Sequence, residues 1–405
     1  MSDIYLDNNA TTPLDPRVLE AMLPFLKGSF GNPASASHKF GWGAEEAVEA
    51  AREQVGGALN AAGKDIIWTS GATEGNNLAI QGLARLPGER RRHIVTSPIE
   101  HKSTVEPCRF LAADGFEVTW LRPDPTGRIS AEQVAAAIRD DTLLVTVMMG
   151  NNELGTVNPV AEIGAVCKGR GVLFHTDAAQ AFGKIPIDVE RMGIDLLTLS
   201  AHKLYGPKGV GALFARRRGP RVRLQPFMLG GEQERGWRCG TLNVPGIVGC
   251  GAAAEIAVRE MPEEAVRLSR LRDRLWSGLA ARLPEIRLNG NGDHRLPHTL
   301  NVSFAYADGD SLMAHLSDIA VSSGSACTSA SVAPSYVLRG IGLSDVAARS
   351  SIRFSLGRFN TEAEIDRSIE RVAETVIRLR RMNPACELAR REATALGHDA
   401  SAPPP

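Results

Sequence analysis

The 405-residue sequence lacks the features that mark secreted, membrane-spanning and nucleic-acid-binding proteins. It has six cysteines and no CxxC pair, which argues against a disulfide framework and an intrinsic metal site. No apolar run approaches the roughly 18 residues that a membrane helix needs. The formal net charge is zero, so bulk charge gives no support for binding to nucleic acid or membrane. The opening MSDIYLDNNATTP has no signal-peptide character. We therefore expect a cytoplasmic protein.

Between residues 65 and 215, short apolar runs alternate with amphipathic helical stretches. Seven runs have the length and the Val, Ile and Leu content of strands: 65–70, 93–97, 116–121, 143–149, 172–177, 196–200 and 210–215. This alternation predicts an α/β domain with a mainly parallel seven-stranded sheet. In such sheets ligands bind at the carboxyl ends of the strands, so the residues after each run are the candidates for chemistry.

After about residue 246 the pattern changes to a long helical region, two strand-like runs at 300–304 and 351–356, and a charged helix at about 362–381. This indicates a smaller α+β domain. We expect an N-terminal segment, 1–15, that packs with the small domain, followed by a large domain, 16–258, and the small domain, 259–384. The tail, 385–405, has no apolar periodicity and is expected to be disordered.

Three of the predicted strands end in residues that suit a phosphorylated cofactor. SGATEGNN, 70–77, opens a helix, and its N–H groups with Thr73 suit a phosphate, although Thr73 also suits a helix cap. Asp177 could pair with a protonated pyridine nitrogen or simply cap a helix. Lys203 could be desolvated enough to form a Schiff base, or could be an exposed loop lysine. The order of phosphate turn, Asp and Lys, each after its own strand, favours a pyridoxal phosphate (PLP) site.

The cysteine Cys327 lies in SSGSACTSAS, 322–331, among small and hydroxyl residues. Such a segment has little to bury, so we expect an accessible, reactive thiol. An incidental exposed thiol is the alternative. The other five cysteines lie in apolar or helical surroundings and are expected to be buried.

Together these segments resemble the cysteine desulfurases of the NifS/IscS type, which are PLP enzymes of fold type I. The resemblance runs from residue 5 to about residue 381. Its motifs are YLDNNATTP, FGNPAS, SGATEGNN, EHK, NNELG, HTDAAQ, AHKLYGPKG, ERGWRCGT, SSGSACTSAS and SSIRFSLGRF. It implies the PLP-dependent transferase fold with a large and a small domain, the cofactor pyridoxal 5′-phosphate and the substrate L-cysteine.

The resemblance also implies a role for each matching residue. Lys203 would hold the cofactor, His101 would stack on its ring and move protons, and Cys327 would be the nucleophile. Asn152 and Arg353 would bind the substrate carboxylate, because a guanidinium matches a carboxylate in shape and charge. The implied cofactor contacts are Ala72, Thr73, Asn152, Asp177, Gln180, Ser200, His202, Lys203 and Thr241, the last reaching the phosphate of the neighbouring subunit in a homodimer.

The expected reaction converts L-cysteine to L-alanine and leaves a persulfide on Cys327. This sulfur would go to an iron–sulfur scaffold protein and to other acceptors, and Cys327 could transiently ligate a cluster on the scaffold. The opening resembles the nitrogen-fixation branch and the Cys327 segment the housekeeping branch, so both stay open. The alternatives are a selenocysteine lyase, another PLP lyase or aminotransferase on the same fold, and a non-catalytic scaffold.

Overall fold

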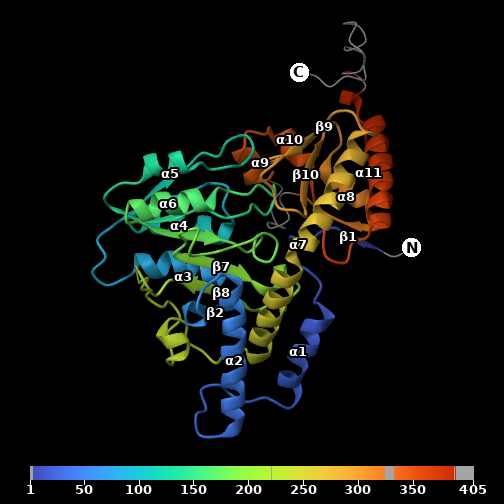
Figure 1. Cartoon of the computed structure of the whole chain (residues 1–405). Helices are drawn as coiled ribbons and strands as arrows, with labels where there is room; N and C mark the ends of the chain where they lie inside the picture. The colour runs from blue at the N-terminus through green and yellow to red at the C-terminus, as the bar shows by residue number, and fades with distance from the viewer. Residues whose placement is uncertain (1–2, 220, 324–332, 387, 389–405) are drawn as a thin grey trace.

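The computed structural model describes residues 3–219, 221–323, 333–386 and 388, and it confirms the predicted α/β fold class (Figure 1). Seven strands form the central sheet in the order β2-β8-β7-β6-β5-β3-β4. They are β2 (Ile66–Thr69), β3 (His93–Thr96), β4 (Glu117–Trp120), β5 (Thr142–Thr146), β6 (Leu173–Asp177), β7 (Leu196–Ser200) and β8 (Gly211–Ala215). Only β8 runs antiparallel to its neighbours, so the sheet is mainly parallel and all seven predicted strands are present.

Helices cover both faces of this sheet (Figure 1). One face packs against α3 (Ala72–Ala84) and α4 (Lys102–Ala113). The other packs against α1 (Pro16–Lys27), α2 (Lys39–Ala58), α5 (Ala131–Ala137), α6 (Val160–Gly169) and the first half of α7 (Val244–Ala280). Because most strands are buried on both faces, their sequences are continuous apolar runs.

A second, antiparallel sheet has the order β12-β13-β10-β9. Its strands are β9 (Ile286–Asn289), β10 (Thr299–Phe304), β12 (Ser322–Ser323) and β13 (Ser351–Ser355). A separate apolar cluster joins it to the second half of α7, to α8 (Gly309–His315) and to α11 (Glu362–Met382). Strand β9 was not among the runs predicted from the sequence. Its half-buried pattern is weaker than that of the buried strands.

Short elements complete the chain. The strands β1 (Ile4–Tyr5) and β11 (Ile319–Ala320) pair in parallel. The helices α9 (Tyr336–Gly340) and α10 (Asp345–Arg349) follow β12 in the described chain. The described residues also include the 3-10 turns η1 (Gly63–Asp65), η2 (Ala201–Lys203) and η3 (Gln233–Gly236). In the part of the chain that the structure describes, no helix combines the length and apolarity needed to cross a membrane.

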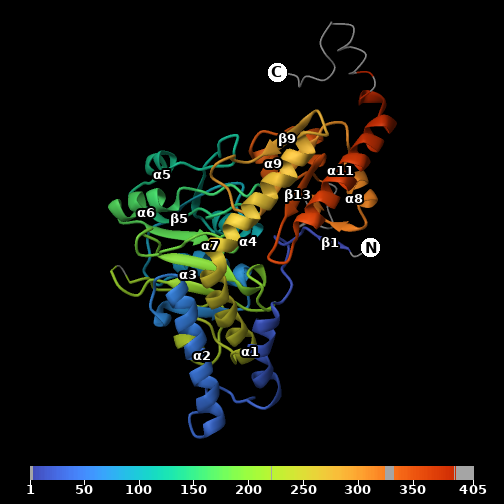
Figure 2. The same cartoon turned by 45° about the vertical axis from the view of Figure 1, so that its right-hand side comes forward.

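The helix α7 runs without a break from the large sheet to the second sheet (Figure 2). Its residues up to Ala257 belong to the first apolar cluster, and those from Leu268 onward belong to the cluster of the second sheet. The boundary expected between residues 258 and 259 therefore lies inside a helix that both clusters share. The division into four parts remains a proposal.

Candidate active site

A cavity of about 500 Å³ lies where the carboxyl ends of the central strands meet the start of the chain. Its lining includes ten of the twelve site residues expected from the sequence: Ala72, Thr73, His101, Asn152, Asp177, Gln180, Ser200, His202, Lys203 and Arg353. They come from elements spread over most of the chain, because parallel strands bring their carboxyl ends to one edge of the sheet.

Lys203 is the last residue of η2, directly after the buried strand β7. Its Nζ donates to the carbonyl oxygen of Asn9 and to that of Ala10, the latter at 2.8 Å. The backbone around it is held by the N-terminal segment, since Thr12 donates to the carbonyl oxygen of His202 at 2.9 Å through its N–H. The lysine is therefore presented to the cavity from a fixed backbone, whereas a loop lysine would extend into solvent.

A chain of hydrogen bonds connects Asp177 to His101. Asn76 Nδ2 donates to Asp177 Oδ2 at 2.7 Å and to Ser103 Oγ at 2.8 Å. Ser103 Oγ lies 2.7 Å from His101 Nδ1, which also accepts from the Ser103 N–H at 3.2 Å. Because Nδ1 is an acceptor in this arrangement, the ring proton of His101 belongs on Nε2. Asn76 was not among the expected site residues.

Burial lowers the pKa of both histidines in the cavity. For His101, burial is the main cause, Asp177 opposes it, and the nearby Lys203 adds to it. For His202, burial with the charges of Lys203 and Lys208 lowers the pKa to about 4. Both imidazoles are therefore neutral near pH 7, and each can donate one hydrogen bond and accept one.

The helix α3 begins at the cavity without a side-chain cap. Its N-cap is Gly71, at φ 149° and ψ −178°, and among the described residues no side chain caps the N–H groups of its first turn. Such N–H groups carry partial positive charge and suit an anion. A Cβ at Gly71 would lie 3.7 Å from Ser200 Oγ, so the helix start and the end of β7 approach closely. The two segments form one side of the cavity.

Arg353 and Asn152 form another side of the cavity. Arg353 lies in β13 and is 3% exposed, and its guanidinium donates to the Asn152 carbonyl oxygen at 3.0 Å and to Asp7 Oδ1 at 2.7 Å. Arg353 Nε and Asn152 Oδ1 are buried and have no hydrogen-bond partner among the residues that the structure describes. Buried polar atoms normally have partners, so these two atoms point to a polar ligand.

Asn9 is a central residue of the site to which sequence reasoning gave no role. It is 1% exposed, and its carbonyl oxygen accepts from Lys203 and from Gln180, the latter at 3.0 Å. Its Nδ2 donates to the Asn152 carbonyl oxygen at 3.1 Å. The available signal was the segment YLDNNATTP, which carried part of the resemblance without an assigned function.

Two expected site residues do not appear in the cavity lining. Thr241 is exposed and lies outside it, so it makes no contact with this cavity from its own chain. Cys327 lies outside the described residues. The other five cysteines are buried, as expected from the sequence. Burial raises the pKa of the Cys108, Cys167 and Cys250 thiols to about 12, which keeps them protonated.

These features fit pyridoxal phosphate. The uncapped start of α3, with Ser200 and His202 beside it, fits a phosphate. Asp177 supplies an anion for a protonated pyridine nitrogen, and Lys203 supplies an amine. The unpartnered atoms of Asn152 and Arg353 leave polar groups for a substrate at the same cavity.

Comparison with known proteins agrees with this geometry. The family model of the class-V aminotransferases matches residues 4–367. The cysteine desulfurase IscS of Anaeromyxobacter dehalogenans is 56% identical over 387 residues, 96% of each chain. A solved NifS-like protein superposes with a TM-score of 0.85 at 39% identity, covering 92% of this chain and 98% of that one. A structure of SspA in complex with cysteine gives 0.78 at 43% identity, covering 88% and 100%.

The match to the family model spans most of the chain, and identity to the curated relative extends over nearly all of both sequences. The chain therefore belongs to the class-V aminotransferase family and, within it, to the cysteine desulfurases, whose cofactor is pyridoxal 5′-phosphate.

Proposed function

We propose that this chain converts L-cysteine to L-alanine and leaves the sulfur as a persulfide on Cys327. The observation that carries the proposal is the meeting of Lys203, Asp177 and Arg353 at one cavity. An amine, an anion for a pyridine ring and a cation for a carboxylate are what a PLP enzyme acting on an amino acid requires. One structural relative has been solved with cysteine bound.

In this proposal Lys203 and the start of α3 would hold the cofactor, Asp177 and Gln180 would bind polar atoms of its ring, and His101 would contact the ring. When bound, PLP supplies an electron sink for the charge that develops at the substrate Cα. Arg353 and Asn152 bind the substrate carboxylate and so hold the amino acid in the cavity that Lys203 also lines. Lys203 moves the Cα proton, and the neutral His101 donates a hydrogen bond through its Nε2–H.

The sulfur step belongs to Cys327. Its thiolate forms an S–S bond with the substrate sulfur while the substrate Cβ–S bond breaks, and Cβ gains a proton. The products are alanine and one persulfide. Burial and raised pKa make Cys108, Cys167 and Cys250 poor alternatives, because the thiolate is the reactive form.

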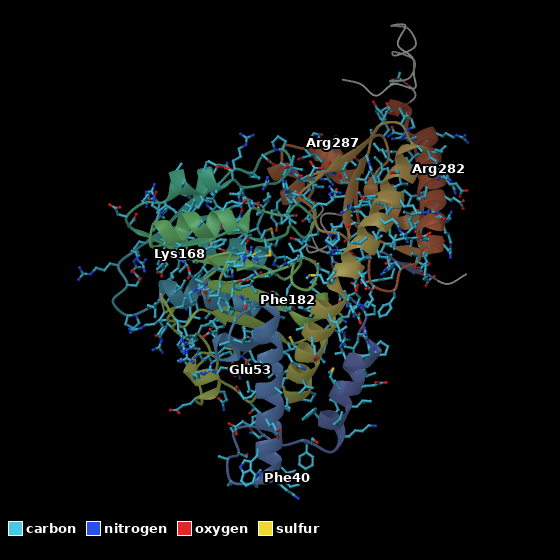
Figure 3. All side chains as sticks on the ribbon, in the orientation of Figure 1. Phe40, Glu53, Lys168, Phe182, Arg282 and Arg287 are labelled. Carbon is cyan, nitrogen blue, oxygen red and sulfur yellow. The ribbon has the colours of Figure 1, made fainter. Side chains whose placement is uncertain are left out.

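The active form in this proposal is a homodimer, in which Thr241 reaches the phosphate site of the partner subunit. The exposed surface near Thr241 supports this. The turn between α1 and α2 exposes Phe30 (74%), and the first turn of α2 exposes Phe40 (48%) and Trp42 (56%). Figure 3 shows Phe40 at the far end of α2 from the second sheet. A pocket of about 370 Å³ is lined by Asn32, in the turn between α1 and α2, and by Leu242, the residue after Thr241. Large exposed apolar surface of this kind marks a protein interface.

The persulfide would supply an iron–sulfur scaffold protein, and the enzyme would act in the cytoplasm. Delivery to a separate protein requires that the partner can reach the thiol that carries the sulfur. The sequence around Cys327 consists of small and hydroxyl residues, and such a sequence favours an accessible thiol.

The variant Cys327→Ser tests the proposed chemistry. It should bind PLP and give the cysteine-dependent change in cofactor absorbance, but form little alanine, because a serine hydroxyl is a poor nucleophile toward sulfur. The wild type, given cysteine without reductant, should gain one sulfur in the mass of the Cys327 peptide. Cys239→Ser is the matched control and should keep that gain. If Cys327→Ser formed alanine at a near wild-type rate, the assignment would change to a PLP lyase. A strong preference for selenocysteine over cysteine would indicate a selenocysteine lyase.

A further inference from the structure

The side chain of Glu74 lies at the end of the cavity that fits a phosphate. Glu74 is in the first turn of α3 and lines the cavity together with Ser70, Gly71, Ala72 and Thr73. Its Oε2 accepts from the Ser70 N–H at 2.8 Å, so this side chain closes the turn between β2 and α3. A carboxylate in this place would repel the phosphate of the cofactor unless a cation compensates its charge.

Arg238 provides such a cation. Its Nε donates to Glu74 Oε1 at 2.8 Å, and its Nη2 donates to Glu74 Oε2 at 3.4 Å. The side chains of Arg238 and Glu74 are 18% and 8% exposed, so solvent screens this ion pair less than it screens a surface pair. Burial raises the pKa of Glu74, but the bonds from Arg238 and Ser70 outweigh burial and hold that pKa below its ordinary value. The carboxylate is therefore ionised near pH 7.

The segment that carries Arg238 is fixed to the central sheet. Glu234 pairs with Arg52 at 2.8 Å, with both side chains at most 4% exposed, and its Oε2 accepts from the N–H of Trp68 in β2 at 2.8 Å. Glu234 also has a φ of 48°, a left-handed conformation that residues other than glycine rarely adopt, and that persists only where surrounding contacts enforce it. Trp237 packs against the apolar cluster that includes α3. Arg238 therefore reaches α3 from a rigid backbone.

We propose that Arg238 is a positioning residue for the cofactor phosphate and that it acts through Glu74. The ion pair holds the carboxylate on the Ser70 N–H and compensates its charge, so that the start of α3 can accept an anion. The inference rests on the proposed function, because it takes the start of α3 as the phosphate site. Arg238 does not line the cavity, and in this account it contacts neither the cofactor nor the substrate.

The test compares two ligands that differ only in the phosphate. The full-length chain is titrated with PLP and with pyridoxal, which has the same ring and aldehyde but no phosphate, and absorbance gives both affinities. Arg238→Ala should lose about tenfold or more in PLP affinity, because it leaves the Glu74 carboxylate near the phosphate without this ion pair. Its affinity for pyridoxal should equal that of the wild type, because pyridoxal has no charged group at that end of the cavity.

A double variant separates charge compensation from a purely structural effect. Adding Glu74→Gln to Arg238→Ala removes the carboxylate, while the amide oxygen can still accept from the Ser70 N–H. The double variant should regain PLP affinity to within about threefold of the wild type. Arg91→Ala is the matched control. It breaks a pair with Glu89 that has the same length, 2.8 Å, but whose residues do not line the cavity, and it should keep both affinities.

The inference would be overturned by an unchanged PLP affinity in Arg238→Ala, by equal losses for PLP and pyridoxal, or by a double variant as weak as Arg238→Ala. A wild type that binds PLP and pyridoxal equally would instead contradict the phosphate site of the proposed function, and the inference would fail with it. If Arg238→Ala does not fold, Arg238→Met decides by the same criteria, alone and with Glu74→Gln, because it keeps most of the side-chain length and removes only the charged group.

Discussion

At the scale of single residues, burial controls the charge of the groups around the cavity. Glu153 is 2% exposed, and burial raises its pKa to about 7, although the bond from Ser335 and the charge of Arg353 oppose this. The same effect lowers the pKa of His202 to about 4. More of the ionisable groups around the cavity are therefore neutral near pH 7 than their ordinary pKa values would predict.

The raised pKa of Glu153 makes stability depend on pH. In the unfolded chain the carboxyl titrates near its ordinary value of 4.5, so between that pH and about 7 the folded state binds more protons. The contribution of Glu153 to stability is thus complete below pH 4.5, falls as the pH rises to about 7, and stays low above it. The loss is about 3 kcal/mol at most.

Glu153→Gln should remove this dependence, because an amide does not ionise and can still accept from Ser335. The free energy of unfolding of the variant relative to the wild type should rise by about 1–3 kcal/mol between pH 5 and pH 8. Urea denaturation at the two pH values measures it, with the exposed Glu46→Gln as the control. A relative stability that is the same at both pH values would contradict the assignment.

At the scale of elements, the start of α3 shows how a local conformation prepares a binding site. The backbone of Gly71 lies in a region that is open almost only to glycine, and this conformation directs the first turn of α3 at the cavity. A side-chain cap would occupy the N–H groups that a phosphate needs. The absence of such a cap is therefore a feature of the site.

Gly71→Ala should weaken PLP binding by tenfold or more and destabilise the fold by about 1–3 kcal/mol, because alanine is strained at this φ and ψ. Gly88→Ala is the matched control: it also has a positive φ, 81°, but lies in an exposed turn with no atom within 4 Å of an added Cβ. It should lose stability and keep its PLP affinity. Absorbance titration measures the affinity, and equal affinity in both variants would remove the α3 start from the phosphate site.

At the scale of the whole molecule, a buried ion-pair network joins the two sheets. Arg358, just after β13, binds Asp15 at 2.7 Å and Glu264 of α7 at 2.8 Å, and all three side chains are at most 10% exposed. Its guanidinium also lies 4.3 Å from the ring of Tyr205, two residues after Lys203. The network therefore connects the small-sheet side of the molecule to the backbone that presents the lysine.

Arg358→Ala should lower the free energy of unfolding by about 1.5–3 kcal/mol, because it removes a charged hydrogen-bond donor that two buried carboxylates share, although Asp15 keeps Arg17 at 2.8 Å and Glu264 keeps Lys184 at 3.6 Å. Arg274→Ala breaks a pair with Asp366 in which both side chains are 47% exposed, and it should cost at most about 1 kcal/mol. Denaturant midpoints of the PLP-loaded enzymes compare the two. Equal losses would mean that the network contributes no more than a surface pair.

The sequence by itself determined the seven central strands and the order of residues at their ends, because apolar periodicity reports local burial and each strand is buried along its own length. It also determined that Asp177 and Lys203 would share one edge, since parallel strands place their carboxyl ends together. Only the tertiary structure decided which distant residues complete the site. Asn9 meets Asn152 across 143 positions, and Ser335 meets Glu153 across 182. Polar contacts of this kind leave no periodic signal in the chain, and they form only when packing brings two elements to one place.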